Sequence, residues 1–582
     1  MHDLLIKGGT VIDGTAADRF TADIAIDNGQ IADIGKLNGP AAKRTIDADG
    51  LLVTPGWVDI HTHFDGQVTW DEVLRPSFDN GVTSVVMGNC GVGFAPRETG
   101  KERWLIGLME GVEEIPGTAL HDGIRWSWTH YSEYLDYLDN MPHALDVGGL
   151  VAHGALRAYV MKDRAELEEP ASEDEARQMA ALVRDAMAAG AFGFSTSRTG
   201  FHRSVDGFLV PGTFADVNEL SIMANEVTKA GHGLMQVVPF GVAGEEEAGP
   251  MRELDMLAQV ARGTGCPIQF TMGQVTDYPG VWRDQIAALE RYHAEGLDIR
   301  PQVFGRGTGV LFSFQATNPF HRHPTYLAEL AHLPHEDRVR KLHDPDIKAK
   351  LLAEQDSVDD AWKVLADNPW PWTYRMGYPM NFEPDPSESV EAIAKRQGRD
   401  PKEVGYDLLL EDDGRAFLTF PLLGYAGYDL EDIREMLLHP LGVMAGSDAG
   451  AHCNTILDAA TPTFMLTHWT RDRTRGPKLP LEWVVQKQTQ GTAQAFGMTD
   501  RGVLRPGFKA DINVIDYDRL QLLLPEYVHD LPSGAGRLIQ QAEGYVATIN
   551  AGQVINQNGE DTGARPGKVI RSRPMPAAMA AE

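Results

Sequence analysis

The segment VTPGWVDIHTH, residues 53–63, ends a predicted β-strand with two histidines one residue apart. Residues i and i+2 of a strand face the same side, so His61 and His63 can point at one ion at the end of that strand. A His-x-His pair also occurs where hydrogen bonds satisfy both rings, and the spacing alone leaves that alternative open. The segments around this pair decide between the two interpretations.

Short strands are predicted at both ends of the chain. Apolar stretches within the first 50 residues are separated by Gly-Gly, Asp-Gly and Asn-Gly, which favour tight turns. Strand patterns return after about residue 503, in ADINVID, GYVATIN and GQVIN. We therefore expect residues 1–54 and 503–582 to form one small β-sandwich domain.

Between these ends, buried strands alternate with helices. The apolar runs SVVMG, LVAHG and FGFST are typical of parallel strands that are covered on both faces. Ser172 and Glu175 form a capping box that begins a helix, and Gly190 can end it just before the run FGFST. Residues 55–502 are therefore predicted to be an α/β domain of repeated β-α units.

The sequence after the first strand resembles the amidohydrolase superfamily. The motif PG-x-x-D-x-H-x-H stands here as Pro55, Gly56, Asp59, His61 and His63. The stretch GVTSVVMGNCGVGFAP is similar to the N-acyl-D-amino-acid deacylase group, as are AHGALR, GAFGFST and GVMAGSDAGAH. The resemblance implies a (β/α)8 TIM-like barrel with a small β domain.

The same resemblance implies a set of metal ligands. Cys90 takes the place of a zinc-binding cysteine after barrel strand 2, and Asp448 that of the strand 8 aspartate, which binds metal and accepts a proton from the attacking water. His61 and His63 complete the set. A buried core thiol at Cys90 and a loop-capping role for Asp448 are the alternatives.

The sequence departs from the group at strands 5 and 6, where further histidines are normally found. The strand 5 counterpart offers Gln236 or Val237, and the strand 6 counterpart offers Thr271 and Met272. Because these residues are poor zinc ligands, we expect one Zn2+ per chain and no two-metal centre. The alternative that the protein works without a metal stays open.

Three further residues are candidates for substrate binding. His153 lies at a predicted strand end and either orients the substrate or is a buried core histidine. His202 and Arg203 follow the strand at 192–196, on a loop at the catalytic face where a cation can hold a carboxylate.

The regular alternation fails between residues 312 and 400, which we predict to be an insertion over the barrel mouth. Trp370, Trp372 and Tyr374 can either wall an apolar acyl pocket or form the core of this insertion. The loop NPFHRHP repeats the His-x-His spacing, but we expect its histidines to be solvated.

The overall composition limits the possible partners. The 582 residues carry a net charge of -31, which repels nucleic acid and anionic membranes. No apolar run reaches the length of a membrane span, and the N-terminus lacks the pattern of a signal peptide, so a cytoplasmic location is expected. A homo-oligomer is an expectation from the resemblance.

These features together predict a metal-dependent hydrolase that cleaves a C–N amide bond in an N-acyl amino acid, possibly a D-amino acid, or a related small amide. A first alternative is hydrolysis of a cyclic or bulky amide or of a lactone. A second is a non-catalytic ligand-binding relative, which the missing histidines suggest and the retained Cys90 and Asp448 oppose.

Overall fold

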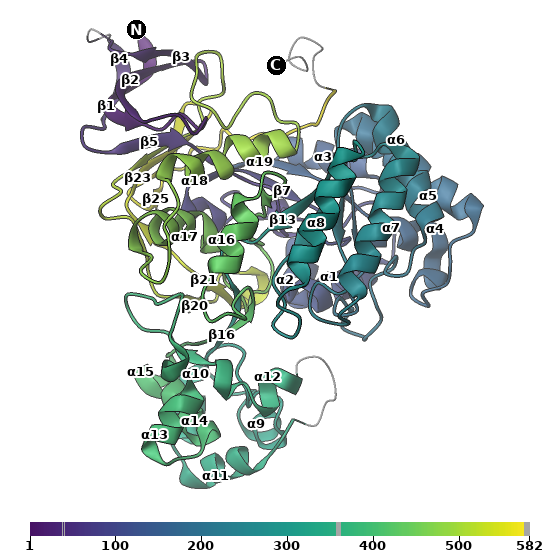
Figure 1. Ribbon diagram of the computed structural model, residues 1–582, viewed down its shortest axis with the longest axis vertical. Coiled ribbons are helices and arrows are strands. Elements are labelled where there is room, and N and C mark those ends of the chain that lie inside the picture. The colour runs from purple at the N-terminus through teal and green to yellow at the C-terminus, as the bar shows by residue number, and fades with distance from the viewer. Residues whose placement is uncertain (38, 40, 357–362, 575–582) are drawn as a thin grey trace.

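The computed structural model describes residues 1–37, 39, 41–356 and 363–574 (Figure 1). Within these residues, both chain ends contribute to one nine-stranded mixed sheet. Strand β5 from the N-terminal part pairs antiparallel with β18 from the C-terminal part, which places Val53 opposite Val514. The strands of this sheet are β1 (His2–Val11), β2 (Phe20–Asp27), β3 (Gln30–Gly35), β4 (Ala42–Asp47), β5 (Leu52–Pro55), β18 (Ile512–Ile515), β23 (Tyr545–Asn550), β24 (Gln553–Gln557) and β25 (Glu560–Asp561).

The Gly-Gly pair near the start of the chain does not end a strand, as the sequence had suggested. Strand β1 continues through it, with a register shift between Ile6 and Gly9. Gly8 has a φ of 71°, which glycine adopts without strain. A Cβ at Gly9 would lie 2.4 Å from Val53 Cγ2, so glycine allows the strand to bulge and still pack closely.

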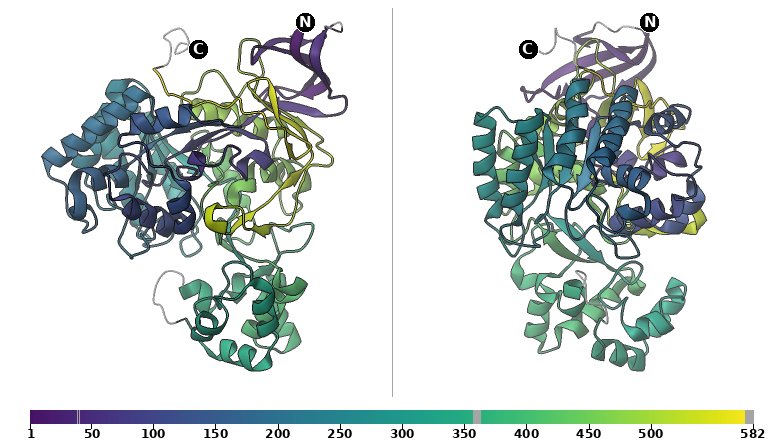
Figure 2. Two further views of the ribbon diagram at one scale, coloured as in Figure 1. Left: turned by 180° about the vertical axis from the view of Figure 1, so that it is seen from behind. Right: turned by 90° about the vertical axis from the view of Figure 1, so that its right-hand side faces the viewer.

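Parallel strands form the middle of the molecule (Figure 2). They pair in the order β6-β7-β8 and then β9-β10-β11-β12-β13-β17. A parallel bridge between Thr62 and Ala449 links the segments that follow β6 and β17. The strands are β6 (Trp57–Asp59), β7 (Val82–Met87), β8 (Asp146–Gly149), β9 (Val151–Ala152), β10 (Gly193–Ser197), β11 (Leu234–Val238), β12 (Ile268–Met272), β13 (Ile299–Val303) and β17 (Val443–Met444).

Helices connect and cover these strands, which confirms the predicted α/β arrangement. In α5, the side chain of Ser172 accepts a hydrogen bond from the Glu175 N–H, and Gly190 ends the helix in the left-handed region, as the capping box predicts. The helices outside the insertion are α1 (Glu102–Glu113), α2 (Gly117–Gly123), α3 (Tyr131–Asp139), α4 (His153–Met161), α5 (Glu173–Ala189), α6 (Val217–Ala230), α7 (Gly249–Thr264), α8 (Val281–Ala294), α16 (Glu431–Leu438), α17 (Thr461–Thr467), α18 (Leu481–Lys487) and α19 (Gln490–Ala495). Among the described residues, none of the helices combines the length and apolarity needed to cross a bilayer.

A helical lobe projects from one end of the molecule (Figure 1). At its base, β14 (Thr308–Phe312) pairs antiparallel with β16 (Leu418–Leu423), and β15 (Tyr374–Arg375) joins β16. Phe314, Phe320 and Tyr406 pack into a core that belongs to the lobe and its base. The lobe helices are α9 (Pro324–Glu329), α10 (His335–Leu342), α11 (Pro345–Ala353), α12 (Lys363–Asp367), α13 (Val390–Gln397), α14 (Pro401–Leu409) and α15 (Glu411–Gly414).

A buried charge network joins the parallel strands to the C-terminal part of the mixed sheet. Asp146, on β8, lies 2.5 Å from Arg501 Nη1 and 2.8 Å from Lys509 Nζ. Lys509 also pairs with Asp511 at 2.6 Å, directly before β18. Because Asp146 is almost fully buried, the two cations replace the water that its carboxylate loses on folding.

Candidate metal centre

The loop after β6 carries His61 and His63, and Asp59 holds this loop in place. The Asp59 carboxylate accepts hydrogen bonds from the backbone N–H and the hydroxyl of Ser447, which follows β17. A Cβ at Gly446 would lie 2.1 Å from Asp59 Oδ1, so glycine is needed where the two loops meet. The first and last parallel strands are thus fixed against each other at the histidine pair.

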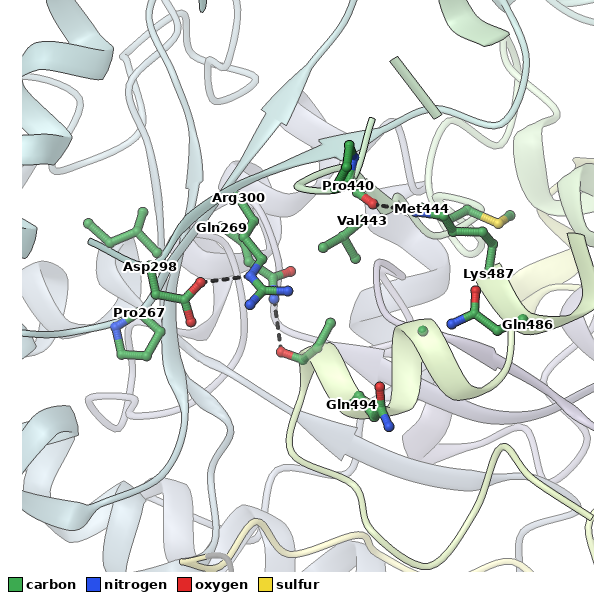
Figure 3. Close-up of a pocket in the computed structure, with 14 residues that line it drawn as sticks. Pro267, Gln269, Asp298, Arg300, Pro440, Val443, Met444, Gln486, Lys487 and Gln494 are labelled. Carbon is green, nitrogen blue, oxygen red and sulfur yellow. Dashed lines mark hydrogen bonds and ion pairs between the residues drawn. The ribbon is translucent and has the colours of Figure 1, made fainter. Parts of the chain in front are cut away.

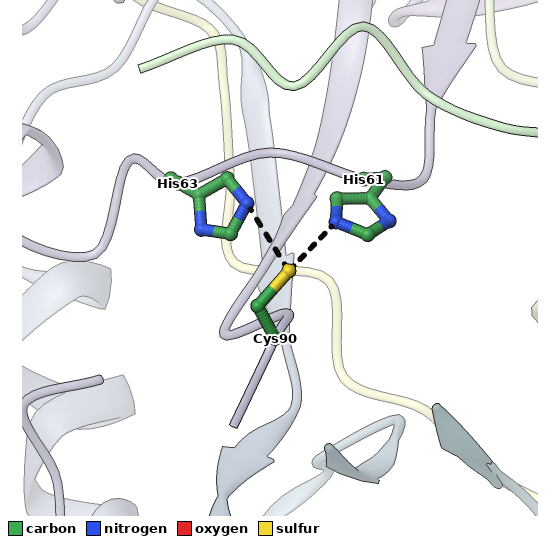
Figure 4. Close-up of side chains that lie close together, drawn as sticks. All are labelled: His61, His63 and Cys90. Carbon is green, nitrogen blue, oxygen red and sulfur yellow. Dashed lines mark hydrogen bonds between the residues drawn. The ribbon is translucent and has the colours of Figure 1, made fainter. Parts of the chain in front are cut away.

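Cys90 and Asp448 reach the histidine pair from the ends of β7 and β17. Both residues have a φ of 57°, in the left-handed region that non-glycine residues seldom adopt. Figure 4 shows the Cys90 thiol pointing at both imidazole rings, with Sγ 3.3 Å from His61 Nε2 and 3.7 Å from His63 Nε2. Asp448 Oδ1 lies 3.0 Å from His63 Nε2 and 3.6 Å from His61 Nε2.

The distances of Cys90 and Asp448 from the two histidines, 3.0–3.7 Å, are close to the edge lengths of a zinc coordination tetrahedron. Zinc bonds of about 2.0–2.3 Å to nitrogen, oxygen and sulfur place neighbouring ligand atoms roughly 3.3–3.7 Å apart. The ligand atoms of His61, His63 and Cys90 all lie within 4.8 Å of one another. Two imidazoles, a thiol and a carboxylate form a donor set that suits zinc, so these residues fit the metal.

The outer nitrogens of both histidines face further polar side chains. Gln302 Oε1 lies 3.0 Å from His61 Nδ1, and Glu113 Oε1 lies 3.3 Å from His63 Nδ1, without the alignment of a hydrogen bond. Metal-binding histidines commonly use this second nitrogen to fix ring orientation. Neither partner could be predicted from the sequence, because nothing local in it places β13 or α1 against the motif.

A chain of amide groups sets the orientation of Gln302. Gln269 Nε2 donates to the Ala495 carbonyl at 2.9 Å, so Gln269 Oε1 faces Gln302 Nε2 at 3.0 Å. Gln302 Oε1 is then left to accept from His61 Nδ1. Because the Ala495 carbonyl oxygen can only accept, it fixes the orientation of both glutamine amides. His61 then carries its proton on Nδ1, and the lone pair of Nε2 faces Cys90.

The charges of the site favour an ionised aspartate. Burial raises the pKa of Asp448, but the hydrogen bond from His63 and the charges of His63, His61 and His452 hold that pKa well below its usual range. Burial lowers the pKa of His63, which favours the neutral ring that metal binding requires. Burial and the charges of Glu113 and Asp448 raise the pKa of the Cys90 thiol, so metal binding there must displace a proton.

His452 is a site residue that the sequence analysis did not assign. Its Nε2 lies 3.5 Å from Asp448 Oδ2, and its Nδ1 lies 3.4 Å from Glu114 Oε2. Burial lowers the pKa of His452, but the close Glu114 carboxylate and the charges of Asp448 and Glu113 raise it to about 10. The imidazolium thus neutralises the acidic residues around it. Its position four residues after Asp448, in GSDAGAH, is the clue that the sequence offered.

Gln236 and Thr271 are buried at the two places where histidines are missing. Gln236 Oε1 accepts the backbone N–H of Cys90 at 3.1 Å, so this side chain supports the cysteine loop. Gln236 Nε2 and Thr271 Oγ1 have no hydrogen-bond partner among the described residues. Neither side chain supplies the imidazole of a second metal site.

The three predicted substrate-binding residues lie in different surroundings. His153 is buried, with Nδ1 2.9 Å from Thr196 Oγ1 and Nε2 2.9 Å from Glu219 Oε1, so both ring nitrogens have protein partners. Arg203 is exposed, and its guanidinium donates to two carbonyls of its own loop. Neither observation brings these residues into the metal centre.

His202 does lie within the electrostatic reach of the metal centre. Burial and the neighbouring His452, His63 and His61 lower the pKa of His202 to about 3, so the ring is neutral at pH 7. Its Nδ1 lies 2.9 Å from Ser197 Oγ. His202 therefore offers a neutral hydrogen-bonding group, and Arg203 is the cation of this loop.

The aromatic residues of the insertion mostly build its core. Trp370 packs with Phe320 in the lobe, and Trp372 stacks on Tyr428 with ring centroids 4.5 Å apart. His323 in the NPFHRHP loop is buried and contacts the Leu351 carbonyl, which corrects the expectation of solvated histidines. Closer to the metal centre, a cavity of about 20 Å³ is lined by Asp448, His452 and Asp458 among others.

Comparisons with known proteins identify the family of this chain. A model of the Amidohydrolase family matches residues 44–556. D-aminoacylase of Alcaligenes xylosoxydans xylosoxydans is 27% identical over 516 residues, covering 88% of each chain. N-acyl-D-aspartate deacylase of the same organism is 27% identical over 573 residues, covering 98% of this chain and 95% of that protein.

Solved structures show the same fold. N-acyl-D-glutamate deacylase from Bordetella bronchiseptica, complexed with zinc and a phosphonate inhibitor, superposes with a TM-score of 0.64 at 23% identity, covering 98% of this chain and all of the other. A D-aminoacylase structure gives a TM-score of 0.63 with the same identity and coverage. The resemblance inferred from the motifs is confirmed, and the chain belongs to the amidohydrolase family.

Proposed function

We propose that the protein hydrolyses the amide bond of N-acyl amino acids, with a preference for the D form, and that it uses one zinc ion. The observation that carries the proposal is the convergence of His61, His63 and Cys90 within 4.8 Å of one another, with Asp448 Oδ1 3.0 Å and 3.6 Å from the two imidazoles. The names of the deacylase relatives support the substrate class. A single metal is proposed because Gln236 and Thr271 stand where the histidines of a second metal site would be.

Zinc bound at this site would lower the pKa of water to about 7 and polarise the amide carbonyl. The role of Asp448 is to accept the proton of the attacking water, since its carboxylate is ionised and its Oδ1 lies 3.0 Å from His63 Nε2. Asp448 then returns that proton to the leaving nitrogen. His452 holds Oδ2 from the other side, and so keeps Oδ1 turned toward the reaction centre.

His202 is our candidate for a neutral hydrogen-bonding contact to the substrate. Substrate binding by His153 and Arg203 stays a prediction. The contacts described above join these side chains to other protein groups and not to the metal centre. We also propose that the parallel strands close into a (β/α)8 barrel over residues 55–502, with a composite β domain from 1–54 and 503–582 and an insertion over 312–400. A cytoplasmic location and a homo-oligomer likewise stay predictions.

The test is a substrate panel measured by amine release. It should contain matched N-acyl-D- and N-acyl-L-amino acids, a cyclic amide and a lactone, each assayed with added zinc. We expect turnover of the D series and a loss of at least about 10²-fold in kcat for Asp448→Asn, because the base is removed. Near-normal turnover by Asp448→Asn refutes the mechanism. Turnover of only the cyclic amide or lactone refutes the substrate class, and binding without turnover indicates a non-catalytic relative.

A further inference from the structure

A second cavity lies at the opposite end of the parallel strands from the metal centre. It measures about 320 Å³ and opens at the amino ends of β12, β13 and β17, with α18 and α19 on its other side (Figure 3). The metal ligands, in contrast, follow the carboxyl ends of β6, β7 and β17. The polar side chains that line this cavity are Gln269, Asp298, Arg300, Gln486, Lys487 and Gln494.

Lys487 brings a charge to this cavity that no carboxylate neutralises. Its Nζ donates to the Gly442 carbonyl at 2.8 Å, and among the described residues it forms no ion pair with a carboxylate. Burial and, to a smaller extent, the charge of Arg300 lower the pKa of Lys487 to about 8. A partly buried ammonium beside a second cation is destabilising unless an anion joins it.

Arg300 lies on the β13 side of the cavity, across from Lys487 (Figure 3). Within the described part of the chain, its guanidinium pairs only with Asp298, through Nε at 2.7 Å. Two cations and one carboxylate leave the cavity with one excess positive charge, in a chain whose net charge is -31. This local excess favours a ligand with a single negative charge.

The remaining lining suits an organic ligand. Pro267, Val443 and Met444 offer apolar contacts, and the amides of Gln486 and Gln494 offer hydrogen bonds. The volume is within the range of roughly 300–1,000 Å³ that small-molecule sites occupy. A single phosphate ion would fill little of this space, and its second charge would lack a counter-charge.

We propose that this cavity binds a small organic monocarboxylate, whose carboxylate pairs with Lys487 and Arg300. The body of the ligand lies against the apolar wall and the two glutamine amides. Gln269 borders the cavity and also begins the amide chain that ends at His61. The proposal for this cavity is based on its charged side chains and its volume, and it does not depend on the proposed hydrolysis.

Calorimetry with lactate and benzoate on the zinc-loaded protein tests the proposal, with inorganic phosphate as the anion control. We expect one carboxylate-binding event, an affinity at least tenfold lower in Lys487→Met and in Arg300→Met, and recovery in Lys487→Arg. The exposed Lys229→Met is the matched surface control, and Asp448→Asn should retain binding because the site lies elsewhere.

Three results would overturn the proposal. They are the absence of carboxylate binding, binding that persists unchanged in Lys487→Met, and binding that disappears in Asp448→Asn, which would place the ligand at the metal centre. Tighter binding of phosphate than of either carboxylate refutes the ligand class. If Lys487→Met fails to fold, amine labelling of the unmodified protein is the test instead. We expect bound carboxylate to protect Lys487 from labelling. Equal labelling of Lys487 with and without carboxylate contradicts the site.

Discussion

Two left-handed residues, Cys90 and Asp448, bring the metal centre together. Each leaves a parallel strand and turns its side chain back toward the loop after β6. The cost of this backbone conformation is of order 1–3 kcal/mol per residue, and it persists where the surroundings fix it, commonly at functional sites. The Cys90 backbone is fixed by Gln236 and the segment before Asp448 by Asp59.

At the residue scale, Gln302 should control metal affinity without touching the metal. Gln302→Met removes the acceptor for His61 Nδ1, which frees the ring to rotate and to change tautomer. We expect zinc affinity to fall about 10- to 100-fold, as for other changes in the groups that orient a metal-binding histidine. Competition with a chromophoric chelator measures this. Gln259→Met on the exposed face of α7 is the control, and equal affinity in both variants contradicts the role of Gln302.

Sequence reasoning named the four residues proposed as ligands, and it missed the side chains that support them. His61, His63, Cys90 and Asp448 lie in motifs of fixed local spacing, and the fold brings all four together. Gln302 and Glu113 lie in β13 and α1, so their contacts depend on tertiary packing that no local pattern encodes. The charge states of the site residues could not be predicted from the sequence either. The neutral ring of His202, for example, follows from its burial and its charged neighbours.

At the scale of elements, the contact between the loops after β6 and β17 determines the site. Gly446→Ala would place a Cβ 2.1 Å from Asp59 Oδ1 and 2.3 Å from the His61 backbone nitrogen. We expect a loss of about 1–3 kcal/mol in unfolding free energy, together with weaker zinc binding, because the loops must separate. Denaturant unfolding and zinc titration measure both effects.

The control for this change is Gly263→Ala in α7, where a Cβ meets no atom within 4 Å. This variant should keep the zinc affinity of the unmodified protein. If Gly446→Ala also binds zinc normally, the two loops are not coupled as described.

The charge network at Asp146 predicts how stability depends on acid. Burial raises the pKa of Asp146, but Lys509 and Arg501 lower it to about 2, against an ordinary value of 3.8. The ionised group therefore stabilises the fold fully above about pH 4, and this contribution is lost as the pH falls from about 4 to 2. Removing one partner of such a buried network costs about 3–5 kcal/mol.

Asp146→Asn should thus be markedly less stable than the unmodified protein at pH 6, with a difference that shrinks toward pH 2. Urea unfolding at both pH values measures it, with the exposed Asp185→Asn as control. A difference that stays constant across this range contradicts the assignment of the network.

The strands and helices themselves were largely predictable. The helix bounded by Ser172 and Gly190 is confirmed, because its caps are local interactions. The predicted break within β1 is wrong, because Gly8 and Gly9 permit a bulge that packs against Val53 and therefore do not end the strand. Turn residues indicate where a chain can bend, and the neighbouring strand decides whether it does.

At the scale of the whole molecule, the helical lobe has its own core and no metal ligand. Its base nevertheless reaches the active end, since the Leu311 N–H donates to the Thr455 carbonyl at 2.7 Å. We expect replacement of residues 314–416 by a short Gly-Ser linker to preserve zinc content and to raise KM. Elemental analysis and substrate kinetics measure the two effects. Loss of zinc from this variant contradicts the separation of the lobe from the metal centre.

The zinc content of protein purified without chelator tests the central claim most directly, measured by elemental analysis together with Cys90→Ala. We predict about one zinc per chain, and its loss in the variant, because Cys90 Sγ lies 3.3 Å from His61 Nε2 and 3.7 Å from His63 Nε2 in the proposed ligand set. Two metals per chain would contradict the single site, and full activity without metal would contradict the mechanism.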